Sequence, residues 1–178
     1  MLVDDVKRLI RTIPDYPKPG IMFRDVTTLM RDAAGFKASI AALAAPFMGQ
    51  KIDAVAGIEA RGFIFGGAVA QALGCGFVPI RKKGKLPWTT VGQQYTLEYG
   101  VDTIEVHLDA MRAGERILIV DDLIATGGTA EAAVKLISRV GGAIAGASFV
   151  VDLPELGGMQ LLKSHGVDAR ALVAYDGH

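Results

Sequence analysis

The segment that most constrains the fold is residues 117–129, which reads ILIVDDLIATGGT. It begins with a short apolar run rich in β-branched residues, the pattern of a strand buried on both faces of a parallel sheet. Asp121 and Asp122 follow directly. They are therefore expected at the carboxyl end of that strand, where open α/β sheets place their ligands. The segment predicts an α/β fold with a binding site at this strand end.

The residues after the acidic pair are suited to hold a phosphate. They supply small side chains, hydroxyl groups and glycines, and a helix can follow over residues 130–140. Successive backbone N–H groups in such a turn, with a helix N-terminus behind them, converge on an anion. A plain strand-to-helix turn is the alternative, but two carboxylates after a buried strand are costly unless they bind something. The loop residues are Ala125, Thr126, Gly127, Gly128 and Thr129.

Residues 120–129 resemble the phosphoribosyl-diphosphate-binding motif of the type I phosphoribosyltransferases. Other phosphate motifs fit less well, because the chain has neither the Gly-Lys-Ser/Thr ending of a P-loop nor G-x-G-x-x-G after a strand. A ligand with a 5-phosphate and a ribose diol needs an anion cradle beside hydrogen-bond acceptors. The resemblance implies that Asp121 and Asp122 hold the diol and that residues 125–129 hold the phosphate.

The length and composition of the chain exclude several classes of protein. A chain of 178 residues is expected to form one domain, residues 1–178. Basic and acidic residues balance at 19 each, so no bulk charge draws the chain to nucleic acid or to an anionic membrane. The only cysteine, Cys75, excludes an internal disulfide and multi-thiolate zinc sites. The N-terminus lacks the pattern of a secretory signal, which predicts a cytoplasmic protein.

Helices and strands are expected to alternate along the chain, which predicts a parallel sheet with helices on both faces. The uncharged residues 62–80 have the length of a membrane span, but their glycines and Pro79 favour a buried helix and strand. Apolar spacing predicts an opening helix over residues 3–13 that ends at Pro14. Further helices are expected over residues 35–47, 62–73 and 130–140, and strands over 52–58, 77–80, either side of Gly100, 117–120, 143–151 and 171–175.

Arg61 follows the strand expected over residues 52–58, so it is placed at the same edge of the sheet as the acidic pair. A guanidinium group suits a diphosphate because it can donate two parallel hydrogen bonds. The alternative is an arginine at a helix start that pairs with Glu59 or with solvent.

A basic tract at residues 81–85 is followed by residues 86–92, which show no helical periodicity. A long loop with cations at its base suggests a lid over an anionic substrate. A solvated basic turn and a nucleic-acid patch are the alternatives, and the zero net charge weakens the second. The cations are Arg81, Lys82, Lys83 and Lys85.

Further segments resemble the adenine-specific members of the same family, namely residues 17–25, 59–63, 81–87 and 97–100. The resemblance implies a central parallel sheet flanked by helices, a small N-terminal hood at about residues 1–30, and a flexible catalytic lid at about residues 82–96. It implies that adenine and 5-phosphoribosyl 1-diphosphate give AMP and diphosphate, a purine salvage reaction. It also implies a homodimer, and Mg²⁺ that is held mainly by substrate rather than by direct side-chain ligands.

The same resemblance implies a role for the residues that meet adenine. The backbone of Met22 to Arg24 would read the edge of the base, and Phe23 would stack on it. From the residues alone, Phe23 lies on a short extended segment where a ring can stack on a flat base, and ordinary core packing is the alternative. Glu98 would contact the purine N7 and could take a proton from it, a contribution of about 10²–10⁴-fold to the rate.

The resemblance also assigns the cations. Arg61 is implied as a catalytic residue that meets the diphosphate, and Lys82 as a further ligand of the substrate. Arg81 and Lys85 would reach the neighbouring site of the homodimer. Loss of diphosphate leaves an oxocarbenium-like centre, so the lid would keep water away from it.

Rival functions fit the sequence less well. Enzymes of this class that act on 6-oxopurines use a lysine late in the chain, and none occurs here between Lys135 and Lys163. A DNA-binding regulator with this fold would carry an added helix-turn-helix domain. A non-catalytic binding module would not need Glu98 and a basic lid together. A metal-dependent hydrolase built on Asp121 and Asp122 lacks histidines at ligand spacing.

Overall fold

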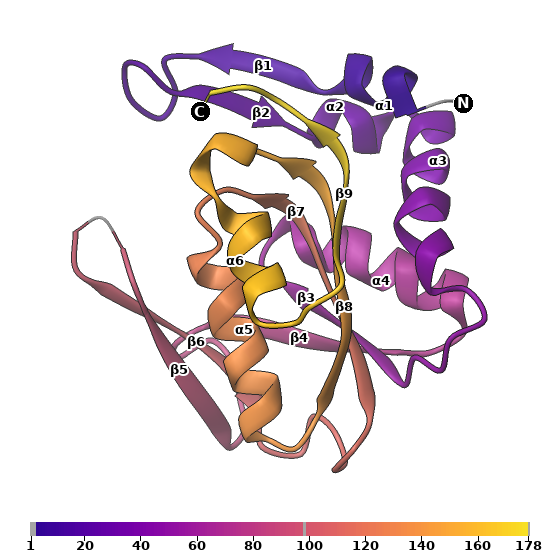
Figure 1. Cartoon of the computed structure of the whole chain (residues 1–178), viewed down its shortest axis with the longest axis vertical. Helices are drawn as coiled ribbons and strands as arrows, with labels where there is room; N and C mark the ends of the chain where they lie inside the picture. Colours follow the sequence, from indigo (N-terminus) through magenta and orange to yellow (C-terminus); the bar gives the residue numbers. More distant parts are fainter. Residues whose placement is uncertain (1–2, 98, 178) are drawn as a thin grey trace.

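The computed structural model describes residues 3–97 and 99–177 and is built on a seven-stranded sheet (Figure 1). Its strands are β3 (Ala54–Ile58), β4 (Gly76–Lys82), β5 (Thr90–Thr96), β6 (Val101–His107), β7 (Arg116–Ile124), β8 (Ala143–Asp152) and β9 (Ala169–Ala174). Their order is β5-β6-β4-β3-β7-β8-β9. The five strands from β4 to β9 in this order are parallel, which confirms the predicted α/β sheet. The β5–β6 hairpin extends one edge in antiparallel pairing.

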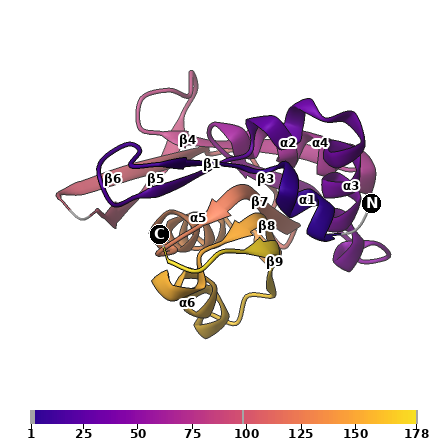
Figure 2. The same ribbon diagram turned by 90° about the horizontal axis from the view of Figure 1, so that it is seen from above.

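The central strand β7 is buried on both faces, as its apolar run predicts. Ile117 and Ile119 pack into one hydrophobic core, whereas Leu118 and Val120 pack into the other. Helices cover the two faces separately (Figure 2). On one face lie α1 (Val3–Leu9), α2 (Thr27–Arg31), α3 (Ala33–Ala44) and α4 (Arg61–Leu73), and on the other α5 (Gly128–Arg139) and α6 (Gly158–Ser164). Short 3-10 turns span Ala45–Phe47 and Pro154–Leu156.

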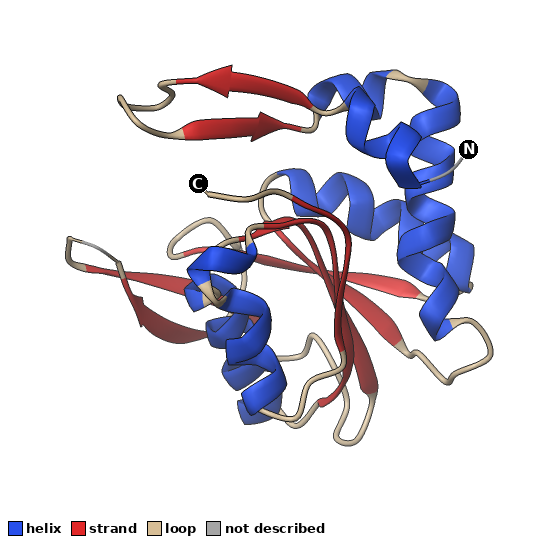
Figure 3. Ribbon diagram, turned by 45° about the horizontal axis from the view of Figure 1, so that its top comes forward, coloured by secondary structure: helices blue, strands red, loops and turns tan. Residues whose placement is uncertain are grey.

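The N-terminal segment differs from its prediction. The helix expected over residues 3–13 was wrong beyond Leu9, because strand β1 (Arg11–Pro14) pairs antiparallel with β2 (Met22–Asp25). Ile13 lies opposite Phe23 in this pairing. An apolar spacing that fits a helix is thus satisfied here by a two-stranded ladder. Figure 3 shows this hairpin above the carboxyl ends of the sheet strands.

The segment over residues 82–96 is partly a strand. Its second half forms β5, which pairs with β6 along its length. The predicted turn between these strands is confirmed at Gly100, where φ is 89°.

The uncharged residues 62–80 divide at Gly74, whose φ of 73° ends α4 before β4 begins. Across residues 3–97 and 99–177, none of the helices has the length and apolar character needed to cross a membrane.

Candidate active site

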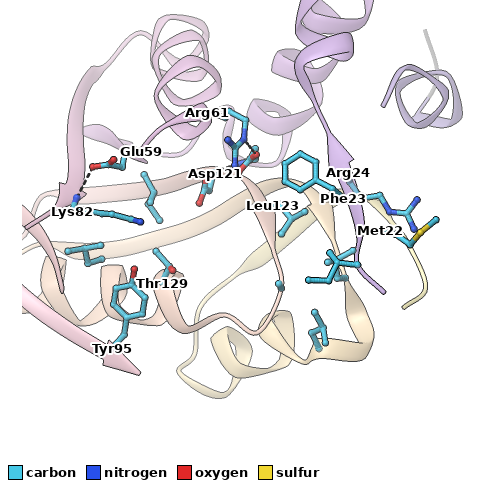
Figure 4. A pocket seen from close by; sticks show the side chains of 17 residues that line it. Met22, Phe23, Arg24, Glu59, Arg61, Lys82, Tyr95, Asp121, Leu123 and Thr129 are labelled. Atoms are coloured by element: carbon cyan, nitrogen blue, oxygen red, sulfur yellow. Dashed lines mark hydrogen bonds and ion pairs between the residues drawn. The ribbon is translucent and has the colours of Figure 1, made fainter. Parts of the chain in front are cut away.

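A cavity of about 500 Å³ lies where the predicted hood meets the carboxyl ends of β3 and β7. It brings together residues that lie far apart in the sequence and that come from the hood, the two strand ends and the β5–β6 hairpin (Figure 4). Besides Met22, the polar and aromatic residues that line it are Phe23, Arg24, Glu59, Arg61, Lys82, Tyr95, Asp121, Asp122 and Thr129.

The loop after β7 forms a smaller cavity of about 160 Å³ beside the main one. Helix α5 begins inside this loop at Gly128, so its first backbone N–H groups lie at the cavity. Gly127 has a φ of 88°, and a Cβ atom there would lie 2.8 Å from the Cα of Gly158. Only glycine therefore fits, and the loop has the geometry of an anion site.

The acidic pair is held by Arg61. The Nε of Arg61 donates to Oδ2 of Asp122 at 2.5 Å, and the backbone N–H of Asp122 donates to Oδ1 of Asp121 at 2.8 Å. Arg61 therefore pairs with Asp122 rather than with Glu59, the partner considered from the sequence. Burial raises the pKa of Asp121 well above its ordinary value, and the charge of Asp122 raises it further. The surroundings of Asp121 therefore favour its protonated form.

Glu59 organises the predicted basic tract. Its Oε1 accepts the backbone N–H of Lys82 at 2.7 Å, and its carboxylate pairs with Lys85 at 3.2 Å and Arg81 at 3.4 Å. Burial by itself would raise the pKa of Glu59, but the hydrogen bond from Lys82 and the neighbouring charges outweigh it and lower the pKa. Lys82 lines the main cavity, whereas Arg81 and Lys85 are held on Glu59.

Phe23 and Arg24 point in different directions from strand β2. Figure 4 shows the Phe23 ring directed toward Leu123 and the Arg24 side chain directed away. The Phe23 ring packs edge-on against Tyr16 at a centroid distance of 5.2 Å and belongs to neither hydrophobic core. Phe23 is therefore a wall of the cavity rather than ordinary core filling.

Sequence reasoning missed Tyr95 as a site residue. Its hydroxyl donates to Oδ2 of Asp102 at 3.4 Å, and Tyr95 lines the main cavity together with Thr129 of the phosphate loop. Burial raises the pKa of the Tyr95 phenol. In the sequence, the alternation of apolar and polar residues around Tyr95 predicted only a strand at this position. The predicted catalytic residue Glu98 lies outside the described residues.

Comparisons with known proteins agree with this geometry. The family model described as a phosphoribosyl transferase domain matches residues 28–166. An adenine phosphoribosyltransferase of Parvibaculum lavamentivorans is 60% identical over 98% of this chain and 99% of its own length. The crystal structure of that enzyme from Rhodothermus marinus has a TM-score of 0.92 and 48% identity, over 97% of this chain and 98% of its own.

A second solved structure is that of adenine phosphoribosyltransferase from Saccharomyces cerevisiae, complexed with an imino-altritol bisphosphate and adenine. It has a TM-score of 0.89 and 37% identity, over 96% of this chain and 98% of its own. The family match covers most of the chain, and the relatives match it nearly end to end. The chain therefore belongs to the phosphoribosyl transferase family, among the adenine phosphoribosyltransferases.

Proposed function

We propose that the protein transfers the 5-phosphoribosyl group from 5-phosphoribosyl 1-diphosphate to N9 of adenine and releases AMP and diphosphate, a step of purine salvage. One observation carries this function. A loop with anion-site geometry, an acidic pair and an aromatic wall follow one another across a single cavity, as Thr129, Asp121 and Phe23 show in Figure 4. That is the order of phosphate, ribose and base in a nucleotide.

The sugar phosphate is assigned to the strand end and its loop. Residues 125–129 and the N-terminus of α5 would bind the 5-phosphate through backbone N–H groups and hydroxyls. Asp121 and Asp122 would accept hydrogen bonds from the ribose hydroxyls. The side chain of Asp122 is already oriented by Arg61, so its second oxygen is the one available to the sugar.

The diphosphate is assigned to the cations. Arg61 and Lys82 lie at the cavity of this chain and would balance the charge that develops on the leaving group. Arg81 and Lys85 would reach the site of the partner subunit in a homodimer. This assignment is supported by their position at the base of the β5–β6 hairpin, where both side chains are partly exposed and pair with Glu59.

The acidic pair also fits Mg²⁺ bound mainly through the substrate. Among the described residues, no group of three or more acidic, histidine or cysteine side chains could hold a metal ion. Asp121 and Asp122 nevertheless supply hard oxygen donors, which suit an ion that takes its other ligands from diphosphate and water. Bound in this way, Mg²⁺ would help to neutralise the diphosphate.

The reaction breaks the bond from the anomeric carbon to diphosphate and forms the bond to N9 of adenine. The backbone of Met22 to Arg24 would hold the base edge while Phe23 stacks on the ring. Glu98 would take the proton that the purine loses at N7. The predicted lid, about residues 82–96, would close over the cavity and exclude water from the oxocarbenium-like centre.

A steady-state assay with adenine, 5-phosphoribosyl 1-diphosphate and Mg²⁺ tests this function. AMP and diphosphate should form in equal amounts, and hypoxanthine and guanine should react far more slowly. Hypoxanthine turnover as fast as that of adenine would refute the specificity. Glu98→Gln should lower kcat more than it weakens binding of the sugar diphosphate, and an equal loss in both would indicate a positioning role.

A further inference from the structure

The C-terminal segment that follows β9 runs back along the β1–β2 hairpin (Figure 1). It places the ring of Tyr175 against Arg24, the residue next to Phe23. The guanidinium carbon of Arg24 lies 4.1 Å from the ring centroid, and Nη1 of Arg24 donates to the hydroxyl of Thr12 at 2.7 Å. The Arg24 side chain is thus held between strand β1 and the C-terminal segment and points away from the Phe23 ring, although Arg24 also contributes to the cavity lining.

Tyr175 is itself fixed to elements outside the hairpin. Its backbone N–H donates to the carbonyl of Asp152 at the end of β8, at 3.1 Å, and its hydroxyl donates to the carbonyl of Lys7 at 3.2 Å. The Lys7 ammonium donates to the carbonyl of Ala174 at 2.6 Å and lies 4.6 Å from the same ring. The ring is therefore attached to the sheet and to α1, and it offers Arg24 a rigid partner.

The β1–β2 hairpin needs such a partner. It is a separate two-stranded sheet, and an isolated hairpin of this size is marginally stable in water. Neighbouring side chains of a strand point to opposite faces, so a contact that fixes Arg24 also fixes the rotation of Phe23. The burial of Tyr175 raises the pKa of its phenol, which keeps the hydroxyl protonated as a donor.

We propose that Tyr175 is a positioning residue for adenine, which holds the Phe23 ring at the base site by clamping Arg24. This inference rests on the base site proposed above for Met22 to Arg24. Tyr175 lies near the C-terminal end of the chain and does not line the main cavity. Its effect should therefore concern the base alone, and the sugar diphosphate should bind as before.

Steady-state kinetics of Tyr175→Leu and Tyr175→Phe test the proposal. The leucine removes the π-face and should raise the KM for adenine about fivefold, since cation–π contacts of partly exposed cations such as Arg24 have up to this strength. The KM for the sugar diphosphate and kcat should stay within about twofold of wild type. The phenylalanine keeps the ring and should retain the wild-type KM for adenine. An unchanged adenine KM in the leucine variant, or an equal rise in both KM values, would overturn the proposal.

Two more variants distinguish the contact between Tyr175 and Arg24, here called the clamp, from a general stabilisation of the hood. Lys7→Met removes the other cation from the same ring and should leave the adenine KM unchanged; a rise as large as that of Tyr175→Leu would overturn the role of Arg24. Arg24→Met should reproduce the effect of Tyr175→Leu even if the latter folds poorly. The double variant should be no worse than either single variant, because the two residues act through one contact. Additive effects would contradict the clamp.

A final variant distinguishes this inference from the base site itself. Phe23→Leu should raise the adenine KM whatever the role of Tyr175. If it does so while Tyr175→Leu does not, the clamp alone is wrong. If Phe23→Leu leaves the KM for adenine unchanged, the proposed base site is wrong, and the proposed role of Tyr175 is wrong as well.

Discussion

Gly62→Ala should damage the ribose site from the carboxyl end of the neighbouring strand β3. Gly62 is buried at the start of α4, where a Cβ atom would lie 2.8 Å from Oδ1 of Asp121 and 3.1 Å from the carbonyl of Val120. Carbon and oxygen do not approach so closely without repulsion, and the carbonyl belongs to the rigid strand β7. The Asp121 side chain must therefore move, and the move would break its hydrogen bond with the backbone N–H of Asp122.

The cost follows from these two contacts. Insertion of a methyl group into a packed site costs roughly 1–3 kcal/mol. The broken hydrogen bond, worth about 0.5–1.5 kcal/mol, accounts for part of that cost. If about 1.4 kcal/mol of it falls on the displaced acceptor of the ribose, the Kd for 5-phosphoribosyl 1-diphosphate rises about tenfold. The KM for adenine should change much less, because Phe23 lies across the cavity.

Gly67→Ala is the matched control, since it makes the same change in the same helix with no atom within 4 Å of the new Cβ. Alanine in a helix interior should stabilise the protein by about 0.5–1 kcal/mol and leave both KM values unchanged. Calorimetric titration with the sugar diphosphate and urea unfolding measure the two effects. Wild-type affinity in a folded Gly62→Ala protein would refute the assignment of Asp121 to the ribose.

Three further substitutions test other parts of the site. Phe23→Leu should raise the KM for adenine about tenfold in steady-state kinetics, since stacking on an aromatic ring is worth about 1–3 kcal/mol per base. Gly127→Ala should abolish phosphate-loop binding and lower the melting temperature, because its φ is 88° and its Cβ would lie 2.8 Å from Gly158; binding as tight as wild type would contradict the loop assignment. Asp25→Asn should destabilise the hood by roughly 1–3 kcal/mol at pH 7. Burial would raise the pKa of Asp25, but hydrogen bonds from Thr27 outweigh it and lower the pKa. The contribution of Asp25 is therefore complete above its unfolded pKa of about 3.9 and is lost as pH falls through the lower folded value. In urea unfolding the gap between variant and wild type should close on acidification, and a gap independent of pH would contradict this.

The sheet could be predicted because its signals are local. Each residue of the run 117–120 is apolar, and the two faces of β7 bury alternate residues in separate cores. The N-terminal segment could not be predicted in this way, since Ile13 satisfies a helical spacing equally well. Ile13 instead pairs with Phe23 in the β1–β2 ladder. Phe23 lies outside the segment whose apolar spacing predicted the helix, so the spacing could not indicate this pairing.

The phosphate loop and acidic pair were likewise predictable because they are contiguous. Glu59 became an organiser of the basic tract only through the register of β3 and β4, which sets Ile58 opposite Ile80 and so brings Glu59 to Lys82. Tyr175 reaches Arg24 across nearly the whole chain. Contacts of this kind follow from the assembled fold rather than from any pattern in the sequence.

A crystal structure of the protein with AMP and diphosphate tests the central claim most directly. We expect the 5′-phosphate in the loop of residues 125–129, the ribose hydroxyls on Asp121 and Asp122, and the adenine ring stacked on Phe23. Diphosphate should lie beside Arg61. If the 5′-phosphate of AMP were bound on the basic tract at Lys82 instead of in the loop, or if the adenine ring lay outside the cavity and away from Phe23, the account would be contradicted.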